Sequence, residues 1–124
     1  MKVRISPLDR LFSKYIRLRA GERCERCGNY VGFSRLQCSH FHGRRKKSVR
    51  WNEDNACALC FTCHRYLTEN PLEHTEWYRQ KIGEDKFLML QIQADQIGKP
   101  DEELTKLYLK QKIKEIERGS NVST

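Results

Sequence analysis

The chain has 124 residues, of which 38% are hydrophobic and 32% are charged, and a chain of this length typically forms one domain rather than two. It contains no run approaching the roughly 18 consecutive apolar residues of a membrane span. Its start, MKVRISPLDR, lacks the apolar segment of a secretory signal peptide. We therefore expect neither a membrane protein nor a secreted one, and we expect the protein to be cytoplasmic.

The net charge of +8 is distributed unevenly along the chain. Residues 1–50 carry 14 Lys and Arg against 3 Asp and Glu, whereas residues 51–124 carry 10 against 13. Within the basic half, the run GRRKKSVR (residues 43–50) places five cations in eight positions. Such a cluster is typical of a phosphate-binding surface, although a solvated loop is the simpler alternative. The charge pattern therefore favours a polyanion as the partner.

The first expected element is a helix over residues 6–20. Ser6 is a typical N-cap and Pro7 a typical first helical residue, and apolar residues then recur at helical spacing on one face. That face consists of Leu8, Leu11, Phe12, Tyr15 and Ile16. We expect it to pack on the core, while the cations of the opposite face point to solvent or DNA.

Short strands are expected near residues 30–33 and 36–41, where β-branched and aromatic residues cluster, and together they would form a small β-hairpin region. The sequence is then polar and turn-rich up to residue 55. The stretch NEDN (residues 52–55) before an apolar run predicts a turn and the start of a helix.

Four further helices are expected in the second half of the chain. The pattern is helical from about residue 61 to residue 69, and Asn70-Pro71 ends that helix and begins another, which reaches Gly83. The segments EDKFLMLQIQADQIG, ending at residue 98, and KPDEELTKLYLKQKIKEIERG predict the last two. In the final segment the acidic residues come first and the basic ones late, which complements the helix dipole.

These elements predict an α+β fold in a single domain. The predicted boundaries are residues 1–118 for the domain, 22–70 for its core, 6–20 and 71–118 for the flanking helices, and 119–124 for a disordered tail.

The six cysteines of a chain in a reducing compartment are better suited to metal binding than to a disulfide framework. Two CxxC pairs, separated by 32 residues, offer the four thiolates of a structural zinc site. The predicted ligands are Cys24, Cys27, Cys60 and Cys63. Cys57-x2-Cys60 is a competing register. We favour Cys60 with Cys63, which leaves Cys57 as a small buried hydrophobe.

The remaining candidates for a functional site are, in chain order, His40, His42, Asn55 and His64. The string LQCSHFHGRRKKSVRWNEDNACALCFTCHRYL (residues 36–67) resembles the ββα-metal motif of the HNH, or His-Me finger, endonucleases, framed by zinc-binding CxxC pairs. A closer resemblance, through RWNEDN, CFTCHRYL and EWYRQKIG, is to phage and prophage HNH proteins such as the lambdoid NinG/Rap recombination nucleases.

The resemblance implies a role for each of these residues. His40 would be the general base, His64 would bind a divalent ion, Mg²⁺ or Mn²⁺, and Asn55 would hold the intervening loop by hydrogen bonds. Many HNH proteins have an Asp metal ligand just before the base, but here that position is Ser39. Two alternatives to the missing Asp stay open. In one, His42 or Cys38 completes the ligand set and favours Zn²⁺ or Ni²⁺. In the other, His40 binds the metal and His42 is the base.

The basic loop after the first histidine would neutralise DNA phosphates, with little base specificity. The predicted nucleic-acid contacts are Arg44, Arg45, Lys46, Lys47, Arg50 and Arg65. Trp51 is more easily read as a hydrophobic anchor than as a stacking group, and His74 as an ordinary surface or core residue.

The leading hypothesis is a metal-dependent DNA endonuclease in a bacterial or phage-infected cell, which leaves 5′-phosphate and 3′-hydroxyl ends by resemblance to the HNH family. The resemblance also raises branched DNA as a substrate. Two alternatives stay open: a zinc-stabilised DNA-binding module with an inactive site, and an accessory protein whose helices after residue 71 dock on phage recombination or packaging proteins. The oligomeric state is not specified by the sequence.

Overall fold

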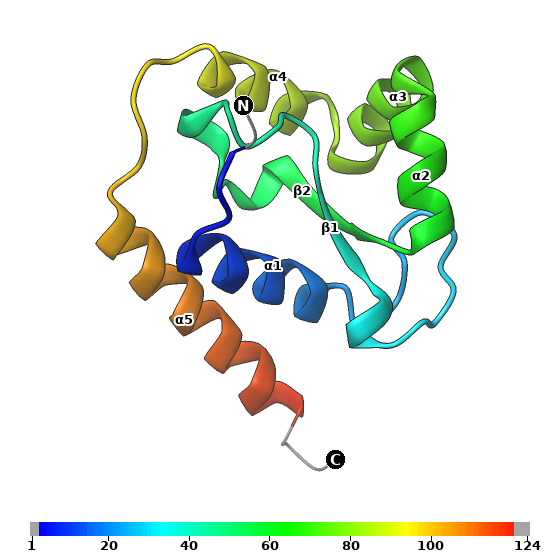
Figure 1. Ribbon diagram of the computed structural model, residues 1–124, viewed down its shortest axis with the longest axis horizontal. Helices are drawn as coiled ribbons and strands as arrows, with labels where there is room; N and C mark the ends of the chain where they lie inside the picture. The colour runs from blue at the N-terminus through cyan, green and yellow to red at the C-terminus, as the bar shows by residue number, and fades with distance from the viewer. Residues whose placement is uncertain (1–2, 121–124) are drawn as a thin grey trace.

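A computed structural model describes residues 3–120 of the chain as a mixed α+β fold (Figure 1). Its regular elements are, in chain order, α1 (Pro7–Arg19), η1 (Phe33–Arg35), β1 (Gln37–His40), η2 (Lys47–Val49), η3 (Glu53–Asn55), β2 (Ala56–Leu59), α2 (Phe61–Glu69), α3 (Pro71–Ile82), α4 (Glu84–Ala94) and α5 (Glu102–Ser120). The predicted fold class is therefore confirmed at the level of an α+β domain.

A two-stranded antiparallel sheet lies at the centre of the fold, with Gln37 opposite Leu59 and His40 opposite Ala56. Because side chains alternate along a strand, β1 presents two faces to different helices. The ring of His40 packs against Phe12 of α1, with ring centroids 5.5 Å apart. Gln37, on the other face, bonds to a histidine of α2. The sheet is thus sandwiched between α1 and α2.

Helix α1 forms for the reasons expected from its sequence. Ser6 accepts a hydrogen bond from the Asp9 backbone N–H, and the Asp9 carboxylate accepts one from the Ser6 backbone N–H, which makes a reciprocal capping box. Pro7 occupies the first turn, where no N–H is needed. The apolar face of α1 is buried, and α5 packs along the helix (Figure 1).

Asp9 also joins α1 to the basic loop. Its buried carboxylate accepts hydrogen bonds from Arg50 Nε at 2.9 Å and Nη2 at 2.6 Å, and from Trp51 Nε1 at 2.9 Å. Burial alone would raise the pKa of Asp9, but the bonds from Arg50, Ser6 and Trp51 outweigh burial and hold that pKa well below the usual carboxyl range. The loop before β2 is therefore fixed to the N-terminus of α1 by an ionised side chain.

On the other face, an aromatic cluster fills the space between β1 and the later helices. Phe41 stacks on Tyr78 of α3 with ring centroids 4.9 Å apart and meets Phe87 of α4 edge-on. The Tyr78 hydroxyl donates to the backbone carbonyl of Asp54. This cluster sets the position of α3 and α4 relative to the turn before β2.

Two predictions of local structure are wrong. Residues 30–33 form no strand, since Tyr30 makes only an isolated bridge with Arg23 and the chain then enters η1. The partner of β1 is instead residues 56–59, which we expected to begin a helix. The apolar run ACAL is buried at all four positions, and such a run suits a central strand as well as a helix.

The predicted helices of the second half are present, with shifted ends. Helix α4 ends at Ala94 rather than at residue 98, and α5 begins at Glu102 after Pro100. Of the tail predicted to be disordered, residues 119 and 120 belong to α5, and residues 121–124 lie outside the described part of the chain.

We expect Asp9→Asn to lower the free energy of unfolding by about 3 kcal/mol at pH 7, because it leaves the guanidinium of Arg50 without its carboxylate. The measurement is urea denaturation of the wild type and the variant, with Asp95→Asn on the surface as the matched control. Because folding lowers the pKa of Asp9, its ionised form stabilises the protein above the ordinary carboxyl pKa of about 3.9, and this contribution is lost as the pH falls further. The difference between the two chains should therefore narrow below about pH 4; equal stability at pH 7 would contradict the assigned role.

Candidate metal centre and histidine site

Four cysteines meet where the loop after α1 reaches the start of α2. The sulfur atoms of Cys24, Cys27, Cys60 and Cys63 all lie within 4.8 Å of one another. Cys60 is the N-cap of α2, and its sulfur accepts a hydrogen bond from the backbone N–H of Cys63 at 3.4 Å. Each CxxC pair thus bends so that both of its sulfurs face the same point.

The surroundings of the cluster shift the pKa values of two of its thiols in opposite directions. Burial raises the pKa of Cys24, but the backbone N–H groups of Cys27, Cys60 and Arg26 more than offset burial and lower the pKa to about 7. Burial raises the pKa of Cys63 to about 12, even though Arg26 Nη1 donates to its sulfur. Thiols this close cannot all ionise without a cation, because each negative charge disfavours the next.

The donor set fits a structural zinc ion. Four sulfurs at about 2.3 Å from a tetrahedral zinc would lie about 3.8 Å apart, and the Cys27 and Cys60 sulfurs are 4.0 Å apart. The predicted register is the one found, because Cys57 lies outside the cluster. Its side chain is buried in β2, and burial raises its pKa well above the usual range.

Metal analysis should find one zinc ion per chain, bound by these four thiolates. Cys63→Ser should lose the zinc and the cooperative thermal transition, because structural zinc contributes about 10 to 16 kcal/mol in small zinc peptides against a typical net stability of about 5 to 15 kcal/mol. Cys57→Ala is the matched control, since it removes a buried thiol outside the cluster and should retain the metal. A Cys63→Ser protein with full zinc content would refute the assignment.

His64 follows Cys63 directly and faces the first residue of β1. Its Nδ1 lies 2.5 Å from the side-chain oxygen of Gln37. An amide oxygen can only accept, so Nδ1 carries the proton and the lone pair of Nε2 is directed away from this bond. Burial lowers the pKa of His64, which favours the neutral imidazole that metal binding requires.

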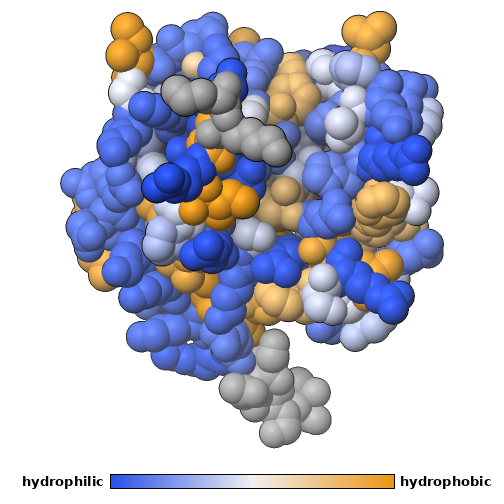
Figure 2. All heavy atoms as spheres, in the orientation of Figure 1, coloured by the Kyte–Doolittle hydropathy of each residue, from blue (hydrophilic) through white to orange (hydrophobic). Residues whose placement is uncertain are grey.

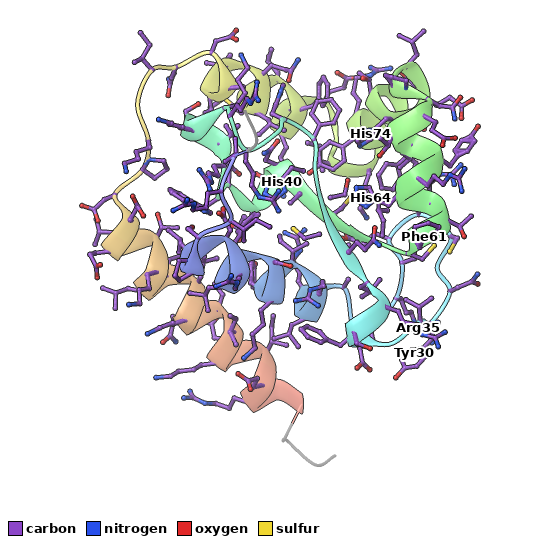
Figure 3. The ribbon with its side chains drawn as sticks, viewed as in Figure 1. Tyr30, Arg35, His40, Phe61, His64 and His74 are labelled. Carbon is purple, nitrogen blue, oxygen red and sulfur yellow. The ribbon has the colours of Figure 1, made fainter. Side chains whose placement is uncertain are left out.

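His40 lies on the opposite face of β1. Its Nε2 is 3.2 Å from the backbone oxygen of Arg50, so Nε2 carries the proton and Nδ1 is the basic nitrogen. Burial, with a smaller contribution from the charge of Arg44, lowers the pKa of His40 to about 4. The ring is therefore neutral at physiological pH. Figure 3 shows His40 near the centre of the view and His64 to its right, toward α2.

Asn55 holds the loop between the strands by three hydrogen bonds. Its side-chain oxygen accepts from the backbone N–H of His42 at 2.8 Å, and its side-chain nitrogen donates to the backbone oxygens of His42 and Val49 at 2.9 and 3.1 Å. The residue is fully buried. The imidazole of His42 turns toward α4, where its Nε2 lies 2.5 Å from the side-chain oxygen of Gln91.

The histidines do not gather into a second preformed metal centre. Within residues 3–120, the four-cysteine cluster is the one group of three or more His, Cys, Asp or Glu side chains whose ligand atoms come this close together. Ser39 is buried. Burial also raises the pKa of Cys38 to about 12, so Cys38 is a neutral thiol in this structure.

Two residues near His64 were not among the predicted site residues, and one of them, His74, was predicted to be an ordinary surface or core residue. Gln37 orients the imidazole, and nothing in its local pattern indicates this contact, which joins a strand to a helix. His74 of α3 lies on the same side as His64 (Figure 3), and burial together with His64 lowers its pKa. Its ring meets Phe41 edge-on at 5.4 Å, and its buried Nε2 has no hydrogen-bond partner within residues 3–120. The turn at Asn70-Pro71 reverses the chain between the two histidines. This turn was the feature of the sequence that could have indicated that His74 lies near His64.

The predicted DNA-binding cations divide into two groups. Arg50 forms an ion pair with Asp9, and Arg44 Nε lies 4.0 Å from the same carboxylate. The exposed members of the loop, Arg45, Lys46 and Lys47, line a shallow pocket of about 300 Å³ against the end of α4. Arg65 is exposed on α2 and pairs with Glu69 at 3.0 Å. Trp51 is buried, as expected of an anchor.

The fold and site together define a small α+β protein built around a four-cysteine cluster that can hold zinc. Among the described residues, no helix is both long and apolar enough to cross a membrane. A family model described as the bacteriophage lambda NinG protein matches residues 2–119. Because this match spans nearly the whole chain, the protein belongs to the NinG family. No curated protein and no solved structure matches the sequence.

Proposed function

We propose that the protein is a metal-dependent DNA endonuclease of the HNH type, acting in the cytoplasm of a bacterial or phage-infected cell. The observation that carries the proposal is the bond between His64 and Gln37. It fixes the tautomer and direction of the imidazole, as partners of metal-binding histidines generally do. The adjacent cysteine cluster holds the same turn of α2 in place.

The reaction is hydrolysis of a phosphodiester. Water attacks phosphorus, the bond to the 3′ oxygen breaks, and the products are a 5′-phosphate and a 3′-hydroxyl. A divalent ion, Mg²⁺ or Mn²⁺, supplies charge stabilisation at the leaving oxygen when it is bound. His64 binds the ion through Nε2, and Asn55 keeps the loop after β1 in position through its bonds to His42 and Val49.

His40 is the proposed general base. The bond between its Nε2 and the backbone oxygen of Arg50 leaves Nδ1 as the nitrogen that can take a proton from water. Since His40 and the residue that orients His64 lie on opposite faces of β1, the scissile phosphate must reach the end of the strand, where His40 is the last residue. His42, just beyond that end, is the alternative base, with His40 then binding the metal ion. If His40 is the base, His42 or Cys38 would complete the ligands, and Zn²⁺ or Ni²⁺ would be the favoured ion.

A plasmid-nicking assay in Mg²⁺, Mn²⁺, Ni²⁺ or Zn²⁺ tests the proposal. The wild type should convert supercoiled DNA to open or linear forms, and His64→Ala should abolish conversion with every ion. Loss of a general base typically costs about 10² to 10⁴ in rate, so His40→Ala and His42→Ala, assayed side by side, distinguish the two candidate bases.

The matched control is Gln80→Ala on the exposed side of α3, which should cut at the wild-type rate. All variants should retain the zinc content and thermal midpoint of the wild type, so that a loss of cleavage is not a loss of fold. Wild-type cleavage by His64→Ala would exclude the proposed site.

A second candidate function is a zinc-stabilised DNA-binding module that does not cut. The observation in its favour is that no histidine of the described chain belongs to a group of three ligands, together with Ser39 in the position where HNH enzymes often have Asp. This candidate predicts DNA binding with no cleavage in any of the four ions. An accessory role, in which α3 to α5 dock on phage recombination or packaging proteins, predicts neither binding nor cleavage of DNA.

A further inference from the structure

A groove of about 640 Å³ lies between the cysteine cluster, the start of α2 and the segment leading into β1. Its lining is mostly apolar, with Val31, Phe61 and cysteines of the cluster, and its polar side chains include Arg35 and Gln37. This volume falls in the range of about 300 to 1,000 Å³ that small-molecule sites occupy. On the face drawn in Figure 2, an apolar patch surrounded by hydrophilic side chains lies near the N-terminal end of α2.

Phe61 gives the groove an aromatic wall that is exposed and firmly placed. Its side chain is 62% exposed although it is the first residue of α2. It lies between two members of the cysteine cluster, Cys60 and Cys63, so its backbone is held on both sides. A single exposed apolar residue is ordinary. An exposed phenyl ring in a groove that also holds an arginine is suited to stacking on a nucleobase of DNA.

Arg35 supplies positive charge at the other end of the groove. It is exposed, and among the described residues no carboxylate lies within 4.0 Å of its guanidinium, unlike that of Arg50. In the described part of the chain, no Asp or Glu lines the groove. A zinc ion with four thiolates carries a formal charge of −2 and repels a phosphate. The favoured position for a phosphate is therefore beside Arg35, and the favoured position for the uncharged base is beside Phe61, next to the cluster.

Gln37 connects the groove to the proposed catalytic histidine. Its side chain lines the groove and also bonds to His64 Nδ1. Figure 3 shows Arg35, Phe61 and His64 along the same side of the molecule. A nucleotide in the groove would thus lie beside the histidine that the proposed function requires.

We infer that this groove binds one unpaired nucleotide of a DNA strand, with its base stacked on Phe61 and its phosphate at Arg35. The inference rests on the proposed function for its choice of DNA. The nucleotide must be unpaired because the bases of a duplex are stacked on one another and offer no free face to a side chain. The groove thereby selects single-stranded segments over continuous duplex.

The test is binding of a 12-nucleotide single strand and of the same sequence as duplex, without added divalent ion. The single strand carries one 2-aminopurine, whose fluorescence falls when the base stacks on an aromatic ring. Stacking is worth about 1 to 3 kcal/mol per base, so Phe61→Ala should weaken binding of the single strand by about tenfold and abolish the fluorescence change. Arg35→Gln should weaken binding and reduce its dependence on salt.

The matched controls are an exposed apolar residue and an exposed cation that lie outside the groove. Leu72→Ala removes an apolar side chain that is 89% exposed on α3, and Arg118→Gln removes an exposed cation near the end of α5; both should bind as the wild type does. Phe61→Trp should retain stacking and binding. Zinc content, measured on every variant, shows that the neighbouring cluster is intact.

Wild-type affinity and fluorescence change in both Phe61→Ala and Arg35→Gln would overturn the inference, as would equal loss of single-strand and duplex binding. These outcomes are independent of cleavage. If the strand binds as described and the wild type never cuts, the nuclease proposal fails alone. If His64-dependent cutting is found but both groove variants bind normally, the groove inference fails alone.

Discussion

Electrostatic repulsion among four sulfurs is the constraint on which the rest of the structure depends. Thiols within 4.8 Å of one another are stable as thiolates only around a cation, and the cluster joins segments separated by 32 residues. It fixes the loop after α1 to the first turn of α2, and so determines the direction of every side chain on that turn. Phe61 and His64 are both placed in this way, one toward the groove and one toward Gln37.

The basic half of the chain has two physical uses for its charge. Arg50, with Arg44 nearby, faces the buried carboxylate of Asp9 and holds the loop to α1. Other cations remain exposed, including Lys46, Lys47 and Arg35. Charge density along the sequence therefore overstates the surface available to DNA, because a cation that pairs with a buried carboxylate cannot also neutralise a phosphate. The distinction is made by one acidic residue 41 positions from its partner.

Much of the local structure was predictable because it depends on neighbours in the sequence. The capping box of α1, the break at Asn70-Pro71 and the two CxxC turns each follow from residues within a few positions of one another. The choice between Cys57 and Cys63 was also made correctly. The strand pairing was predicted wrongly, because the partner of β1 follows a loop of 15 residues, numbers 41–55. The run ACAL also suits a buried strand or a helix equally.

The sequence by itself determined the α+β class, the helix boundaries set by caps and prolines, and the cysteines able to share a metal ion, because these depend on local chemistry and on spacing. The tertiary structure alone decided which histidine faces which partner. A strand of alternating side chains sends His40 toward Phe12 and Gln37 toward His64, and only the packing of helices on both faces assigns those directions. It also decided that Phe61 and Arg35, 26 residues apart, line one groove, because the cluster folds the chain back on itself there.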